Sequence, residues 1–284
     1  MKEKLNKPNW NEYKTDILTL QKANALIDIK FADDYFDIMR NEWLLDKYIS
    51  RLGITDEETP CESFPAIDKA IEAGYAINLI VQCLKDDTIV CFKHKSLGEY
   101  TGLNAYVANV SYSDIKDLTI KNTKQHIKTL EEVLDHIAGR APITIEILNE
   151  AFVGKMEGKI AQILENYCDK YNACGQVAIM SINPFVLEWF YENAPWYTRI
   201  LKSGNFKDIK YYANIKVSKL KKLKYIKLAK ADFVAYIAKD IPCKYLKRKK
   251  VVGILAYNVM SQEEYKRILP HIDNIIFTNF KPEI

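Results

Sequence analysis

From residue 47 onward, short apolar runs alternate with amphipathic stretches, and this alternation restricts the fold more than any other feature of the chain. Apolar runs bounded by turns predict strands, whereas apolar residues spaced three and four apart predict helices. We predict eight strands, at Tyr48–Leu52, Ala76–Gln82, Ile89–Lys93, Ile143–Leu148, Gln176–Ser181, Thr198–Lys202, Phe233–Ile237 and Gly253–Val259. We predict the intervening helices at Phe64–Ala73, Thr129–Ala138, Gly154–Tyr171, Pro184–Asn193 and Ser261–Leu269.

Eight strands in about 240 residues favour a TIM (β/α)8 barrel over an open doubly wound sheet, because no G-x-G-x-x-G motif follows the first strand. The second and third strands are joined only by Cys83 to Thr88, which is too short for a parallel crossover. We therefore expect a hairpin-like join there. Residues 11–46 have helical periodicity, so we divide the chain into an N-terminal helical leader (1–46) and a barrel (47–284).

Composition excludes several classes of protein. With 48% apolar and 27% charged residues, the chain is not collagen-like, low-complexity or disordered. A net charge of +4 is too small to imply nucleic acid as a partner. No run of 18 apolar residues occurs and Met1–Trp10 is polar, so we predict a cytoplasmic protein. The six cysteines include no C-x-x-C pair, which argues against a zinc knuckle or a redox motif.

A basic segment lies between residues 216 and 230. Seven lysines alternate there with apolar residues, at positions 216, 219, 221, 222, 224, 227 and 230. The spacing predicts an amphipathic helix with lysines along one side. A solvated outer helix of the barrel is the simplest interpretation, and contact with an anionic membrane surface or with a partner is the main alternative. Contact with nucleic acid is a further alternative for this segment.

Six sequence blocks have a characteristic order and spacing: Ala70-Ile-Glu-Ala-Gly74, Lys85-Asp86, Leu130-Glu-Glu-Val-Leu134, Ile145-Glu-Ile147, Ser181-Ile-Asn-Pro184 and Asp273-Asn-Ile-Ile-Phe277. Together they resemble the glycerophosphodiester phosphodiesterase family over about five-sixths of the chain. The resemblance implies a (β/α)8 barrel that hydrolyses phosphodiesters in lipid metabolism. It also implies two histidines as acid and base, an arginine that holds the phosphate, and Ca²⁺ or Mg²⁺ held by carboxylates.

The catalytic positions implied by this resemblance carry other residues here. Arg51-Leu52-Gly53 stands where the family has His-Arg-Gly, and Asn78-Leu79-Ile80 stands where it has the metal-binding Glu-x-Asp. Lys93-His94 corresponds to His-Asp without a gap, although a slip of one residue would return His94 to the catalytic position.

Glu146 keeps the one remaining metal-ligand position. The lysine expected two residues later is Leu148, and a Trp-Thr pair on the last strand appears as Tyr257-Asn258. Ser181 and Asn183 belong to a block that shapes a strand-to-helix turn, so we interpret them as structural. We place His126, His136 and His271 on the surface.

A single carboxylate cannot replace the hydration shell of a divalent cation, so we predict no tightly bound metal and no cofactor. We predict that an anion such as phosphate or a glycerophosphodiester binds at the C-terminal end of the barrel, with ligand-binding residues Arg51, Asn78, Lys93, Glu146, Arg199 and Tyr257. Three alternatives remain: a dead site in which Arg51 or Lys93 pairs with Glu146, an active phosphoric diester hydrolase that uses Lys93 or His94 as proton carrier, and a membrane-surface or partner-binding module that uses residues 216–230.

Overall fold

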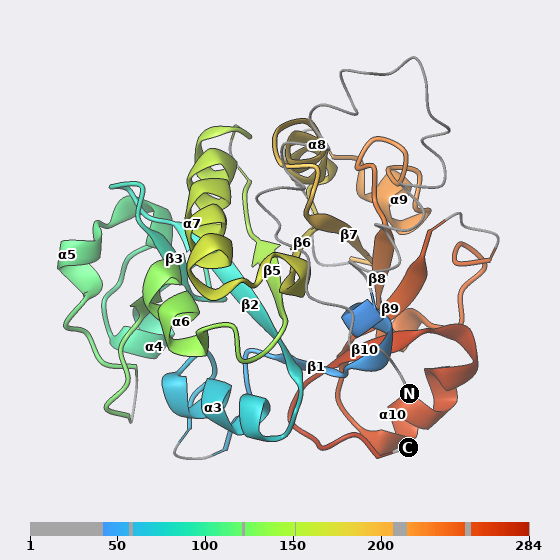
Figure 1. Cartoon of the computed structure of the whole chain (residues 1–284), viewed down its shortest axis with the longest axis horizontal. Helices are drawn as coiled ribbons and strands as arrows, with labels where there is room; N and C mark the ends of the chain where they lie inside the picture. Colours follow the sequence, from blue (N-terminus) through green and yellow to red (C-terminus); the bar gives the residue numbers. More distant parts are fainter. Residues whose placement is uncertain are drawn as a thin grey trace, which may run out of the picture.

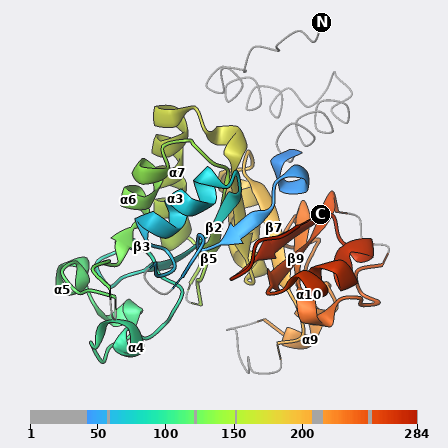
Figure 2. The same ribbon diagram turned by 90° about the horizontal axis from the view of Figure 1, so that it is seen from below.

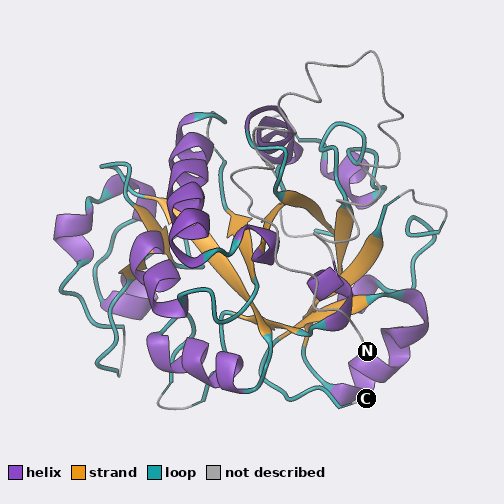
Figure 3. Cartoon of the chain, in the orientation of Figure 1, coloured by secondary structure: helices purple, strands orange, loops and turns teal. Residues whose placement is uncertain are grey.

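The computed structural model describes residues 42–56, 59–120, 123–150, 152–206, 215–247 and 251–283. Eight parallel strands form a closed barrel with helices around it (Figures 1 and 3). In barrel order they are β1 (Ile49–Arg51), β2 (Ala76–Cys83), β5 (Ile143–Ile147), β6 (Val177–Ser181), β7 (Thr198–Ser203), β8 (Phe233–Ile237), β9 (Gly253–Val259) and β10 (Asn274–Phe277). Because β1 pairs with both β10 and β2, the sheet closes, and the predicted (β/α)8 barrel is confirmed.

The third predicted strand lies outside this barrel. β3 (Ile89–Cys91) runs antiparallel to the end of β2 and is followed in the sheet by β4 (Lys128–Thr129). The hairpin-like join is thus confirmed, but the assignment of the third strand to the barrel was wrong. β1 has only three residues and pairs with residues 76–78 of β2. Residues 81–83, at the C-terminal end of the same edge of β2, therefore pair with β3 instead. The eighth barrel strand is instead β10.

Five helices match their predicted bounds to within one residue at each end. They are α3 (Phe64–Glu72), α6 (Leu130–Ile137), α7 (Lys155–Tyr171), α8 (Pro184–Asn193) and α10 (Gln262–Ile268). The agreement has a local cause, because polar side chains accept the first free N–H groups: Ser63 caps α3, Asn183 caps α8 and Ser261 caps α10. Single 3₁₀ turns occur at Val107–Asn109, Cys174–Gln176, Ala238–Asp240 and Leu269–His271.

The basic segment does not form the predicted long helix. Only α9 (Val217–Lys221) is helical, and turns follow it. The carbonyl oxygens of Leu220 and Lys221 accept side-chain hydrogen bonds from Ser203 and Tyr236, and Leu223 has a positive φ of 56°. A left-handed residue ends a helix, so the lysines do not share one helical face.

Between β3 and β4 the chain forms a small unit with its own apolar core, which includes Val90, Leu97, Val107 and Ile115. It carries the short helices α4 (Gly98–Thr101) and α5 (Tyr112–Ile115) and lies at one side of the barrel (Figures 1 and 2).

Residues 42–46 are helical and close the N-terminal end of the barrel. Trp43 and Leu44 join the apolar cluster inside it, and the Asn274 amide donates to the carbonyl oxygen of Leu44 (2.8 Å). Residues 1–41 of the predicted leader lie outside the described residues. No described helix is long and apolar enough to cross a membrane.

Candidate functional site

Charged side chains enter the barrel at the C-terminal ends of its strands. Ile49 of β1 and Ile200 of β7 belong to the apolar cluster inside the barrel. Because side chains alternate along a strand, Arg51 and Lys202, two residues further on, face the same interior. This is the end at which (β/α)8 enzymes carry their sites. We call the charged and polar residues at this end the strand-end cluster; they are Arg51, Glu62, Asn78, Lys93, His94, Glu146, Lys202 and Tyr257.

Glu146 forms a buried ion pair with Lys202, a residue that the sequence analysis did not include. The side chain of Glu146 is 2% exposed and that of Lys202 is 14% exposed. The Lys202 ammonium also lies over the ring of Tyr257, 4.6 Å from its centre. One alternative from the sequence was a site in which Arg51 or Lys93 pairs with Glu146. A cation does pair with Glu146, but it is Lys202.

Four buried polar atoms of the cluster have no hydrogen-bond partner among the described residues: Asn78 Oδ1, His94 Nε2, Glu146 Oε2 and the Tyr257 hydroxyl. Asn78 uses its Nδ2 to donate to Thr144 Oγ1 (3.0 Å). Burial raises the pKa of Tyr257, with Glu146 raising it further and Arg51 lowering it, so the hydroxyl lies near both charges. Because buried polar groups are rarely left unpaired, this region is suited to a polar ligand.

Glu62, in the loop between β1 and α3, is a second buried carboxylate that the sequence analysis missed. Its oxygens accept hydrogen bonds from the backbone N–H groups of Ile80 (3.3 Å) and Lys93 (3.1 Å). Glu62 has a positive φ of 62°, and its own N–H donates to the carbonyl oxygen of Leu52 (2.9 Å). This local conformation turns the carboxyl inward, beside the charges of Lys93 and Arg51.

Burial raises the pKa of Glu62 to about 8, although Lys93, Arg51 and the two backbone N–H groups lower it. Between its ordinary value of 4.5 and about 8, the folded protein therefore holds a proton that the unfolded chain has released. The contribution of Glu62 to stability therefore falls as pH rises through this interval, by up to about 1.4 kcal/mol per pH unit. Below pH 6.5 the lowered pKa of His94 acts in the opposite direction, so the effect of Glu62 is clearest between about pH 6.5 and pH 8. We expect Glu62→Gln to remove this contribution, as measured by urea unfolding at a series of pH values. An unchanged slope would contradict the assignment.

His94 and Lys93 both lie at the cluster. The His94 ring stacks on Tyr100 of the small unit, with 3.7 Å between ring centres, and its Nε2 is buried without a partner among the described residues. Burial lowers the pKa of His94 to about 4, and the nearby charges of Lys93 and Arg51 lower it too. The imidazole is therefore neutral near pH 7.

Arg199, predicted as a ligand-binding residue, lies away from the cluster, near the N-terminal end of β7. It pairs with Asp232 (2.9 Å), and its guanidinium donates to the carbonyl oxygens of Lys230 and Tyr197. It also lies next to inward-facing Ile200, so its side chain points outward. The structure therefore does not bring Arg199 to the other predicted residues.

Ser181 and Asn183 have structural contacts, as interpreted from the sequence. Ser181 donates to the carbonyl oxygen of Ile147 (2.9 Å), and Asn183 caps α8. His136 pairs with Asp68 (2.9 Å), and His126 contacts the carbonyl oxygen of Leu118, so neither reaches the cluster.

The residues at the cluster do not fit the divalent cation that the family resemblance implies. No group of three or more His, Cys, Asp or Glu side chains among the described residues could hold a metal ion. Asn78 and Ile80 supply no carboxylate, and Glu146 already has the Lys202 ammonium beside it. Ca²⁺ and Mg²⁺ need several oxygen ligands, so this donor set is inadequate.

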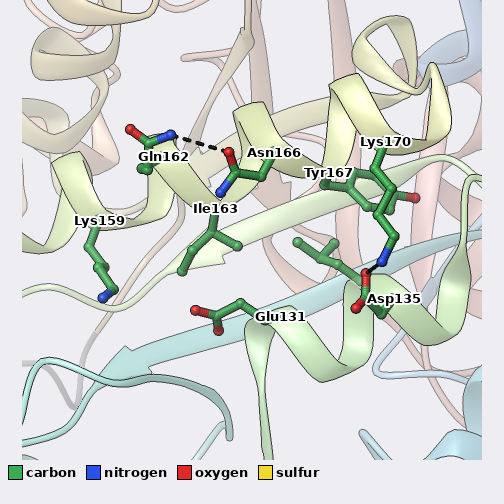
Figure 4. A pocket seen from close by; sticks show the side chains of 9 residues that line it. Glu131, Asp135, Lys159, Gln162, Ile163, Asn166, Tyr167 and Lys170 are labelled. Carbon is green, nitrogen blue, oxygen red and sulfur yellow. Dashed lines mark hydrogen bonds and ion pairs between the residues drawn. The ribbon is translucent and has the colours of Figure 1, made fainter.

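Two surface cavities lie outside the barrel interior. One, of about 350 Å³, lies between α6 and α7, where Glu131, Asp135, Lys159 and Lys170 surround the apolar side chain of Ile163 (Figure 4). Lys170 there is already paired with Asp135 (2.9 Å). The other, of about 380 Å³, is lined by Ile54, Tyr75, Phe277 and Phe280. Neither contains a residue of the strand-end cluster.

Comparison with known proteins identifies the family. The model of the glycerophosphoryl diester phosphodiesterase family matches residues 56–281. No curated protein sequence matches the chain. A glycerophosphodiester phosphodiesterase of Thermotoga maritima is 18% identical, with a TM-score of 0.62 over 81% of this chain and 93% of that one. A phosphodiesterase of Oleispira antarctica, solved in complex with the product sn-glycerol-3-phosphate, is 12% identical, with a TM-score of 0.68 over 82% of this chain and 92% of that one. The chain thus belongs to the glycerophosphoryl diester phosphodiesterase family.

Proposed function

We propose that the strand-end cluster binds a small phosphate-bearing anion without metal-dependent hydrolysis. The observation that carries this proposal is the excess of positive charge. Arg51 and Lys93 form no ion pair with a described carboxylate, and Lys202 is balanced by Glu146 alone. Glu62 is mostly neutral below about pH 8. Two uncompensated cations beside free polar atoms favour an anion with several oxygen acceptors.

The family supports the nature of the ligand. The Oleispira antarctica relative holds sn-glycerol-3-phosphate, which is a phosphate-bearing anion. A glycerophosphodiester or a phosphomonoester would place negative oxygens near Arg51 and Lys93. The free Tyr257 hydroxyl and Glu146 Oε2 could then meet polar groups of the same ligand.

Substitution of the two cations tests the proposal. We expect Arg51→Met and Lys93→Met each to weaken phosphate binding about tenfold, because a hydrogen bond to a charged group contributes about 1.5–3 kcal/mol. Lys95→Met is the matched control, since Lys95 is exposed and pairs with Glu150 (2.5 Å). Titration calorimetry with inorganic phosphate, with and without EDTA, gives the affinities. No binding by the unsubstituted protein would refute the proposal.

The pKa of Glu62 predicts a pH dependence for the same site. Glu62 faces Cys61, Lys93 and Arg51, and its ionisation near pH 8 removes one unit of positive charge from the site. Sulfate keeps its charge over this range, so we expect its affinity to fall severalfold between pH 7 and pH 9. Glu62→Gln should abolish the change, whereas Glu99→Gln, in α4, should leave it intact.

A second candidate function is hydrolysis with an altered site. Neutral His94, whose Nε2 is buried without a partner among the described residues, could accept a proton. Assays on glycerophosphocholine with Ca²⁺, Mg²⁺ or chelator separate the two functions. Turnover that needs a metal would refute our main proposal. Metal-independent turnover that His94→Gln abolishes would establish the second.

A further inference from the structure

The ion pair inside the barrel has a different charge balance from the metal site that the family resemblance implies. Three carboxylates around a divalent cation carry a net charge of −1. In this chain Asn78 and Ile80 occupy two of those positions, and a single carboxylate, Glu146, faces a single ammonium, Lys202, for a net charge of zero. Both the number of carboxylates and the charge of the cation are therefore smaller than in that metal site, and the remaining pair is neutral.

Burial and two side-chain contacts hold the Lys202 ammonium in one position. Its side chain is 14% exposed, one donor is used by Glu146 Oε1, and the Tyr257 ring lies 4.6 Å below the charge. An ammonium has three N–H donors, and among the described residues only Glu146 accepts one from Lys202. Glu146 Oε2 and the Tyr257 hydroxyl, which have no partner among the described residues, belong to the two side chains that contact it.

We infer that the Lys202 ammonium is the resident cation of this site, standing in place of a divalent ion on Glu146 and donating to an oxygen of the bound anion. This inference rests on the proposed anion binding and adds to it that binding is independent of divalent metals. The ligand class is then an oxyanion, such as phosphate or a phosphate ester, held by three fixed side-chain cations at Arg51, Lys93 and Lys202.

Phosphate titrations on the full chain test the contact. Lys202→Met with Glu146→Leu removes both charges of the pair and keeps its net charge at zero. We expect this double variant to bind inorganic phosphate at least tenfold more weakly, and Lys202→Arg to retain most of the affinity. Lys95→Met should not change it, and thermal unfolding checks that each variant is folded.

The outcomes separate the two proposals. If Arg51→Met weakens binding and the double variant does not, the anion site stands and the inference about Lys202 falls. If the unsubstituted protein does not bind phosphate, both fall. If millimolar EDTA lowers the affinity of the unsubstituted protein, a metal takes part and the inference is again refuted.

Calcium binding gives a measurement that does not depend on phosphate. Asn78→Glu with Ile80→Asp restores the two implied carboxylates but leaves Lys202 in place, and we expect no calcium binding by calorimetry. Adding Lys202→Ala should create a calcium site. Calcium binding by both variants, or by neither, would show that the ammonium does not occupy the position of the cation.

Discussion

Lys202→Met is expected to lower the free energy of unfolding by about 3–5 kcal/mol, because it leaves the Glu146 carboxylate buried without its cation. Glu146→Leu should have a similar effect, since it leaves the buried Lys202 ammonium without its carboxylate. The double variant should lie within about 1.5 kcal/mol of the unsubstituted protein, because replacing a whole buried pair by apolar side chains is often neutral. Urea unfolding of all four proteins gives the coupling energy.

Lys95→Met is the control for this cycle. Lys95 and Glu150 are 60% and 39% exposed, so the loss of their pair should cost less than about 1 kcal/mol. If Lys202→Met has an equally small effect, the pair with Glu146 is not the buried interaction described above.

Gly53→Ala is the second substitution with a large expected effect, about 2–5 kcal/mol. Gly53 has a φ of +85°, which strains any other residue, and an added Cβ would lie 2.6 Å from the backbone carbonyl of Ala66 in α3. It follows Arg51 by two residues, so displacement of α3 should also disturb the strand-end cluster. We expect weaker phosphate binding together with a lower midpoint of thermal unfolding.

Gly74→Ala separates the cost of backbone strain from the cost of a steric clash of the added Cβ. Gly74 has a similar φ of +75° at the other end of α3, but nothing lies within 4 Å of its added Cβ. The expected cost is about 1–2 kcal/mol, from the backbone alone. Equal effects of the two substitutions would show that the contact with Ala66 is unimportant.

The strands and helices could be predicted where the local sequence determines them. α8 and β9 have the predicted bounds because apolar spacing and, for α8, the Asn183 cap act over a few residues. The pairing of β3 with β2 followed from the short join between them, but the apolar residues of β3 do not show that it lies outside the barrel. That depended on β1, which is too short to cover the edge of β2.

The alternation of side chains along a strand predicts which residues of the site point into the barrel. Arg51, Glu146 and Tyr257 lie at strand ends and reach the barrel interior as expected. The same alternation placed Lys202 inside and Arg199 outside, and it was available in the sequence of β7. The position of Glu62 could not be predicted in this way, because Glu62 lies in a loop. Its own left-handed backbone conformation turns the side chain inward, and hydrogen bonds from the backbone N–H groups of Ile80 and Lys93 hold it there.

The closure of the barrel by Asn274 has a consequence for synthesis on the ribosome. Asn274 donates to the carbonyl oxygens of Leu44 and Lys47, and β10 is the partner that completes β1. These contacts join residues about 230 positions apart. A nascent chain therefore has one uncovered edge of β1 until β10 has left the exit tunnel, and contacts of such long range slow folding. The barrel thus cannot close during synthesis before β10 emerges, although β1 and β2 are made more than 190 residues earlier.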